Sequence, residues 1–147
     1  RAIDAASGEA LEGVEVAAQR VAAVNGVPRT SPPVRSSRAG SFAIEGLGPG
    51  DFELRAMAPG YAPLRLERVS LRRGQDEEIA LALQSALDLH VRVRDEAGEA
   101  LPGAEILVRQ DADGARPRVV LEGRSDAAGM ARFSGLAAGP VRVVARS

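Results

Sequence analysis

Apolar and polar residues alternate along most of the chain, and this period of two is typical of half-buried β-strands. Turn signals such as Asn25-Gly26, Pro49-Gly50 and Asp113-Gly114 separate the alternating runs. Residues 77–87 favour a helix by propensity alone, but they alternate in the same way as the rest. The pattern therefore predicts an all-β fold of short antiparallel strands with turns between them.

The alternation also predicts which residues point into the core. Further strands are expected at Leu64–Val69, Ile79–Leu83 and Leu87–Val93. In the first half of the chain the inward residues are expected to be Val14, Val16, Phe42, Ile44, Phe52 and Leu54. In the second half they are expected to be Ile106, Val108, Phe133, Val141 and Val143.

Two blocks of sequence recur about 90 residues apart. Gly8–Val16 returns as Gly98–Ile106, with Gly-Glu-Ala-Leu-x-Gly in both copies. Gly40–Ala56 returns as Gly129–Ala145. Because the two spacings agree within one residue, they indicate a duplication. Gly8 and Gly98 are expected at turns that need a positive φ angle.

The two copies are expected to be incomplete in different places. The first has only Arg1–Ile3 where the second has the strand Leu87–Val93. The second ends at Ser147 without counterparts of Leu64–Val69 and Ile79–Leu83. We expect the missing strands to exist in the native protein or to come from another chain. The predicted domains are residues 1–84 and residues 85–147.

The order of these motifs resembles the carboxypeptidase regulatory-like domain family. The motifs that carry the resemblance are Asp4–Val16, Gly40–Ala56 and Ala-Pro-Gly-Tyr at residues 58–61. The second copy matches more loosely, because Val141 stands where the first has Phe52. The resemblance implies two tandem prealbumin-like or Ig-like β-sandwich modules, both truncated.

Composition narrows the range of partners. The net charge is −1, so electrostatics provides no reason to expect nucleic acid or an anionic membrane as a partner. No apolar run approaches the roughly 20 residues that span a bilayer. Every basic residue is arginine, and with abundant alanine and glycine this is typical of a GC-rich bacterial genome. The chain begins with Arg1, so we expect an internal piece of a longer protein.

Residue types exclude several kinds of chemistry. Without cysteine there is no thiol catalysis, and without lysine there is no Lys–Asn isopeptide bond. A catalytic zinc ion needs about three protein ligands, whereas His90 is the sole histidine and is expected on the polar face of a strand. Asp111–Gly114 lacks the further ligands of a calcium loop, and we interpret it as a turn. Tyr61 is expected to pack at a turn rather than to stack on a sugar.

We therefore expect no enzyme activity, no catalytic, cofactor-binding or metal-binding residues, and no cofactor. The long variable loop Val21–Ala39, with Arg29, Arg35 and Arg38, is where we first expect a partner contact.

The leading hypothesis is a non-catalytic structural or protein-interaction module of a larger exported bacterial protein. Its expected location is extracytoplasmic, that is periplasmic, cell-surface or secreted. The expected partner is a protein or a neighbouring module of the same chain, with no nucleic acid and no direct membrane insertion. The alternatives are an accessory domain of a metallopeptidase or another enzyme, and a ligand-binding domain.

Overall fold

The structure, a computed structural model, describes residues 1–21, 29–111 and 118–147. Within these residues it contains β-strands and no helix, which confirms the all-β prediction. The chain divides into two compact units, Arg1–Ser85 (unit 1) and Ala86–Ser147 (unit 2). The expected positive φ angles of Gly8 and Gly98 are observed, at 74° and 87°.

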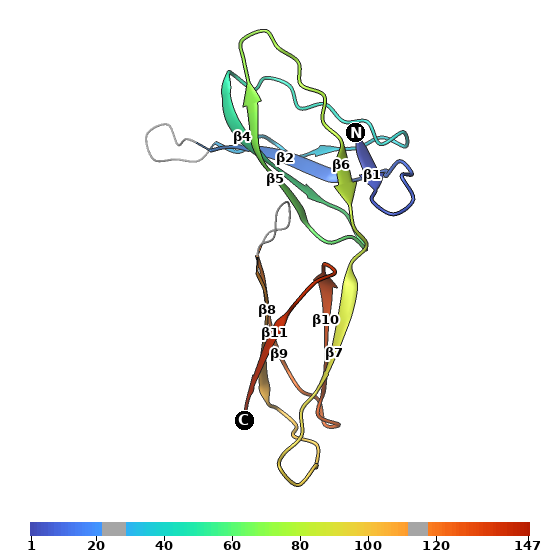
Figure 1. The fold of residues 1–147 in the computed structure, drawn as a ribbon, viewed down its shortest axis with the longest axis vertical. Helices are drawn as coiled ribbons and strands as arrows, with labels where there is room; N and C mark the ends of the chain where they lie inside the picture. Colours follow the sequence, from blue (N-terminus) through green and yellow to red (C-terminus); the bar gives the residue numbers. More distant parts are fainter. Residues whose placement is uncertain (22–28, 112–117) are drawn as a thin grey trace. The chain divides into compact units, whose positions relative to one another are not determined.

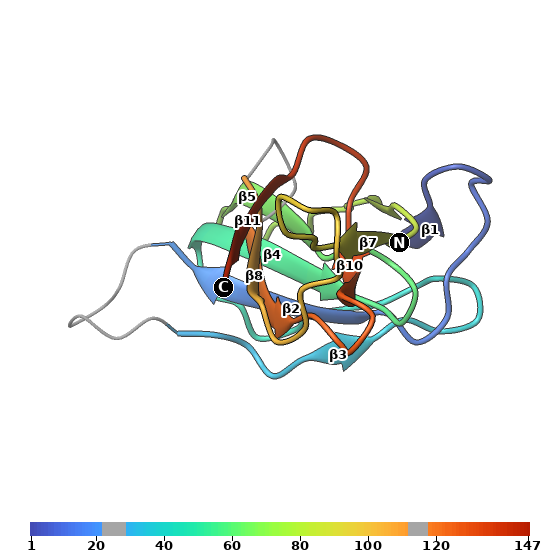
Figure 2. The same ribbon diagram turned by 90° about the horizontal axis from the view of Figure 1, so that it is seen from below.

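Unit 1 contains two sheets, β1-β6 and β3-β2-β4-β5 (Figures 1 and 2). Its described strands are β1 (Ala2–Asp4), β2 (Glu15–Arg20), β3 (Val34–Arg35), β4 (Gly50–Met57), β5 (Leu64–Leu71) and β6 (Leu81–Leu83). The larger sheet is antiparallel throughout, whereas β1 and β6 are parallel, against the antiparallel expectation. Alternation determines the face that a residue occupies and not the direction of the neighbouring strand, so the sequence pattern could not show this.

The core of unit 1 lies between the two sheets. Val14 and Val16 from the β2 side pack with Leu81 and Leu83 of β6, and all four side chains are buried. Ala18, Phe52 and Leu54 form a second buried cluster further along β2 and β4. The inward orientation predicted for Val14, Val16, Phe52 and Leu54 is confirmed.

Unit 2 also contains two sheets, β10-β7 and β11-β8-β9, and all of its strand pairs are antiparallel (Figure 1). Its described strands are β7 (Leu87–Arg92), β8 (Glu105–Gln110), β9 (Val119–Arg124), β10 (Met130–Leu136) and β11 (Arg142–Arg146). Ile106 and Val108 of β8 pack on Phe133 and Leu136 of β10, so the core again lies between the sheets. The predicted burial of Ile106, Val108 and Phe133 is confirmed.

The three-stranded sheet of unit 2 has the same register as part of the larger sheet of unit 1. The strands β3-β2-β4 correspond in order to β9-β8-β11. In unit 1, Glu15 of the central strand β2 is paired with Arg35 of β3 and Met57 of β4. In unit 2, Glu105 of the central strand β8 is paired with Arg124 of β9 and Arg146 of β11. Equivalent residues of the two units are about 90 positions apart, which is the spacing of the sequence repeat.

The strand expected at Phe42 and Ile44 does not form. Both side chains are partly buried and pack on the core, as the alternation predicts, but no strand is assigned to this segment. In unit 2 the matching strand, β10, pairs with β7. No strand of the described part of unit 1 is paired with residues 41–47, so their backbone has no ladder to join.

Val143, which was expected in the core of unit 2, is 39% exposed, although it lies on the same face as its paired residue Val108. Leu87, at the start of β7, is 49% exposed. Val141 is only partly buried. Alternation assigns the face of a strand, but burial also requires an element that covers that face.

The variable loop expected at Val21–Ala39 is partly a strand. Residues 22–28 lie outside the described residues, whereas Val34–Arg35 form β3 and pair with β2 at the edge of the sheet (Figure 2). The sequence analysis also missed β9 (Val119–Arg124), which occupies the same position in unit 2. Both strands lie next to turn-rich segments, where the period of two is short or interrupted.

Equivalent inward positions should respond differently to truncation. Leu54→Ala removes a 4%-exposed side chain and should lower the free energy of unfolding of unit 1 by about 2–5 kcal/mol. Val143→Ala, at the matching register of unit 2, should lower it by less than about 1 kcal/mol, because little apolar area is removed from contact. Urea melts followed by circular dichroism measure both changes. A larger loss for Val143→Ala would show that its side chain is covered in solution.

Candidate functional site

The residues considered for catalysis or metal binding do not come together. His90 is exposed on β7, opposite Arg132 of β10. Within the described ranges, no three His, Asp or Glu residues are grouped closely enough to hold a metal ion. Most of Asp111–Gly114 lies outside the described residues. Across the same ranges there is no helix that is long and apolar enough to span a bilayer.

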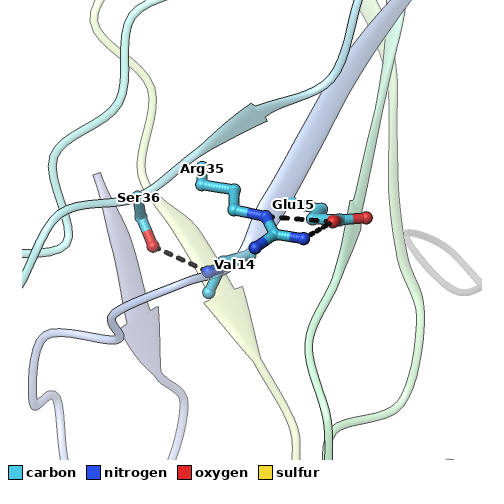
Figure 3. Close-up of polar contacts among 4 residues, drawn as sticks. All are labelled: Val14, Glu15, Arg35 and Ser36. Atoms are coloured by element: carbon cyan, nitrogen blue, oxygen red, sulfur yellow. Dashed lines mark hydrogen bonds and ion pairs between the residues drawn. The ribbon is translucent and has the colours of Figure 1, made fainter.

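Ser36, directly after β3, connects the edge of the unit 1 sheet to the chain that leads into β2 (Figure 3). Its buried Oγ accepts a hydrogen bond from the Val14 N–H at 2.9 Å and donates one to the Leu11 carbonyl oxygen at 2.6 Å. The Ser36 backbone also bonds with Gly13 and Val14. One hydroxyl therefore satisfies a backbone donor and a backbone acceptor, which would be costly to leave unpaired in the interior.

Arg35 and Glu15 cross the outer face of the same strand pair (Figure 3). The Arg35 Nε and Nη2 atoms donate to the same Glu15 Oε1 atom, at 3.1 and 2.6 Å. The side chains are 73% and 42% exposed, so water screens the pair and its contribution to stability is small. The ion pair joins residues that are directly opposite in the β2–β3 register, but it adds little to the free energy of unfolding.

Unit 2 repeats both features. The Ser125 Oγ accepts from the Ala104 N–H at 2.9 Å and donates to the Leu101 carbonyl oxygen at 2.6 Å, the same two distances as at Ser36. Arg124 pairs with Glu105 at 2.7 Å, at the register positions of Arg35 and Glu15. Sequence reasoning missed both serines, because a single serine in a turn-rich segment carries no distinctive pattern.

The loop after β1 is closed by Asp4. Its Oδ1 accepts from the N–H groups of Ala6 and Ser7 at 2.8 Å, and its Oδ2 accepts from the Tyr61 hydroxyl at 2.9 Å. These hydrogen bonds, the Ser7 and Ala6 backbone ones first, lower the pKa of the Asp4 carboxyl and stabilise its charged form. The bond to Asp4 raises the pKa of Tyr61. Tyr61 also packs on the core, so its predicted role at a turn is confirmed.

The edge strand β11 and the outer face of its sheet form a candidate surface of unit 2, which is called the β11 surface. All five residues of β11 are exposed, and within the described chain β11 has a neighbour, β8, on one side only. The outer face contains a concavity of about 650 Å³, with Leu107 and Val144 between charged side chains. The charged residues are Arg109, Arg124, Arg142 and Arg146, with Glu105 and Glu122.

The arginines of the β11 surface outnumber its carboxylates. Arg124 is paired with Glu105, whereas no ion pair forms at Arg109, Arg142 or Arg146 among the described residues. The sequence analysis placed Val141 and Val143 in the core and did not predict the charged concavity on the outer face. In the variable loop where a partner contact is expected, Arg35 and Arg38 form ion pairs with Glu15 and Glu12.

Comparisons with known proteins give one matching family and several similar solved structures. The family model of the carboxypeptidase regulatory-like domain matches residues 1–84. No curated protein matches the sequence. A streptococcal ancillary pilin is 20% identical, with a TM-score of 0.44 over 98% of this chain and 51% of the pilin chain. The Bacillus anthracis TIE protein is 19% identical, with a TM-score of 0.38 over 90% of this chain and 24% of that protein. The chain thus spans about half of the first structure and about a quarter of the second.

The two serines provide a matched pair of substitutions. Ser36→Ala and Ser125→Ala should each lower the free energy of unfolding of their own unit by about 1–3 kcal/mol, because each leaves a buried N–H and a carbonyl unpaired. Hydrogen exchange resolved by residue can assign the loss to one unit. Ser37→Ala, at an exposed neighbouring position, serves as the control. Equal effects at Ser37 and Ser36 would contradict the assigned role of the buried hydroxyl.

The Asp4–Tyr61 contact should be visible in the titration of Asp4. Tyr61→Phe removes one of the donors that lower the pKa of the Asp4 carboxyl, so this pKa should rise towards its ordinary value, measured by carboxyl ¹³C NMR. Because the folded-state pKa is lowered, the stability from this contact is present above the unfolded pKa, about 3.9. It is lost as the pH falls through the folded pKa. An unchanged titration in Tyr61→Phe would contradict the hydrogen bond.

Proposed function

Because the chain belongs to the carboxypeptidase regulatory-like domain family, we propose that it is a non-catalytic structural and protein-interaction module of a larger exported protein. In this proposal unit 2 is a second copy of the module in unit 1. The proposed location is outside the cytoplasm, and the proposed partner is a protein segment. The family match supports the domain type, and the repeated register and repeated serine contacts support the duplication.

The observation that carries the proposal is that the buried polar side chains form hydrogen bonds with backbone groups of their own units. Ser36 and Ser125 bind backbone groups of their own units. Gln110 donates to the Ala137 carbonyl oxygen at 2.8 Å and accepts from the Ala137 N–H at 3.0 Å, which ties the end of β8 to the chain after β10. Each of these groups is therefore occupied in closing the fold. A catalytic group needs a free polar atom directed at a substrate.

The proposal predicts that the purified chain turns over no peptide or ester substrate, with or without added zinc. The measurement is hydrolysis of fluorogenic peptide and ester libraries, with the activity followed through gel filtration. Activity that elutes with the chain and is lost in His90→Ala would overturn the proposal, because His90 is the sole histidine. His90→Ala should leave the melting temperature nearly unchanged, because the side chain is exposed.

A further inference from the structure

Two arginines lie directly opposite one another on the outer face of the three-stranded sheet of unit 2. Arg109 of the central strand β8 is paired in register with Arg142 of β11, and both side chains are exposed. Directly opposite residues of neighbouring antiparallel strands have Cβ atoms about 5 Å apart, and like charges at such positions destabilise the sheet. Among the described residues neither arginine forms an ion pair, so no carboxylate of that part of the chain neutralises them.

The other charges of this face are better balanced. Glu105 of β8 lies in register between Arg124 of β9 and Arg146 of β11, and it forms an ion pair with Arg124 at 2.7 Å. A carboxylate between two arginines reduces their repulsion, because it attracts both of them. The unbalanced positive charge of the face is therefore greatest at Arg109 and Arg142.

An apolar hollow lies between these two rows of charged residues. The concavity of about 650 Å³ contains Leu107 and Val144, which are paired in register. Glu122 lies opposite Leu107 on β9, so the strand β8 separates it from Arg142. Pockets that bind small molecules have volumes of about 300–1,000 Å³ and combine an apolar lining with a few polar groups. The concavity has the size and the composition of such a pocket.

The exposure of this outer face does not depend on which strand lies beside β11. In unit 1, β4 occupies the place of β11 and has β5 along its other edge. With β5 in place, the outward residues Arg55 and Met57 of β4 are still exposed. A further strand extends a sheet sideways, in the hydrogen-bonding direction, and leaves the two faces uncovered. The face around Arg109 and Arg142 is therefore open for the same reason.

The corresponding positions of unit 1 carry no pair of like charges. By register, Arg109 and Arg142 correspond to Gln19 and Glu53, which are paired with each other in the same way. Glu53 is neutralised by an ion pair with Arg55 at 2.8 Å. Because unit 1 forms the same strand pair without the two arginines, the fold does not require them.

From these observations we propose that Arg109 and Arg142 bind the anionic group of a small organic ligand, a carboxylate or a phosphate, whose apolar part lies on Leu107 and Val144. Guanidinium groups bind both kinds of anion through charge-assisted, often bidentate, hydrogen bonds. An anion between the two arginines is attracted by both and offsets their mutual repulsion. This ligand site is additional to the protein contacts of the proposed function and requires no catalysis.

Three ring compounds test the site: benzoate, phenyl phosphate and the neutral benzamide. Benzoate should bind at least about tenfold more tightly than benzamide, because the two share the ring and differ in charge. Phenyl phosphate should bind more tightly still, because its phosphate carries about two negative charges at pH 7. Added salt should weaken the binding of both anions.

Nuclear magnetic resonance titration of the ¹⁵N-labelled chain measures the affinities and locates the site. The largest shift changes are expected in the segments 107–109 and 142–144, which contain the paired arginines and the apolar residues between the strands. Gln19 and Glu53 of unit 1 provide an internal control at the same register, and their signals should not move.

Substitution of one arginine at a time provides matched variants. Arg109→Gln and Arg142→Gln should each weaken benzoate binding at least about fivefold, because only one of the two guanidinium groups remains. Arg94→Gln removes the same charge from an exposed position outside the concavity and should change the affinity by less than about twofold. Arg109→Gln and Arg142→Gln should keep or raise the melting temperature, since each relieves the repulsion between like charges.

Four results would overturn the proposal. Equal affinities for benzoate and benzamide would exclude recognition of the charge, and equal effects of Arg94→Gln and Arg142→Gln would place the anion elsewhere. A lowered melting temperature in Arg109→Gln and Arg142→Gln would assign the pair a role in the fold instead of in binding. Binding that is observed with this chain and absent from the complete protein would show that another segment neutralises the arginines. Hydrolytic activity enters none of these measurements, so failure here is distinguishable from failure of the proposed function.

Discussion

Coverage of one apolar sheet face is the constraint on which each unit depends. In unit 1, Leu81 and Leu83 of the short strand β6 are buried against Val14 and Val16, and this contact joins the two sheets. Burying a leucine or valine side chain stabilises the folded state by about 1.5–3 kcal/mol. In a chain with only 3% aromatic residues, such aliphatic contacts supply most of the core.

Short polar side chains close the ends of this core. Ser36 and Ser125 place one hydroxyl between a backbone donor and a backbone acceptor, and Gln110 does the same with its amide. Gly40 occupies the neighbouring corner of unit 1, where a Cβ atom would overlap the carbonyl oxygen of Ala2. These groups serve the fold, which is why the buried polar residues point to a structural role.

At β11, the inner face of the sheet is not fully covered. Val143 faces the core side and remains exposed, while Arg142 and Arg146 on the other face carry charge along the edge. Proteins commonly place charged residues on edge strands because charge discourages unspecific pairing. Here both charges are positive, so they oppose pairing with a second identical edge.

The sequence by itself determined that the chain forms an all-β fold and which face most residues of its strands occupy. Val16, Leu54, Ile106 and Val108 were predicted to point inward from alternation alone, because successive side chains of a strand point to opposite faces. The repeat of Gly8–Val16 was also visible, because duplicated turns need the same glycines at the same spacing.

The tertiary structure alone decided how strands pair and which faces are covered. The parallel pairing of β1 with β6, the missing ladder at Phe42 and the exposure of Val143 all depend on neighbours far away in the chain. The same holds for Ser36, whose hydroxyl meets Val14 and Leu11 only after β3 has paired with β2. A local pattern specifies the orientation of a side chain, whereas burial and hydrogen bonding are completed by whichever segment the fold brings beside it.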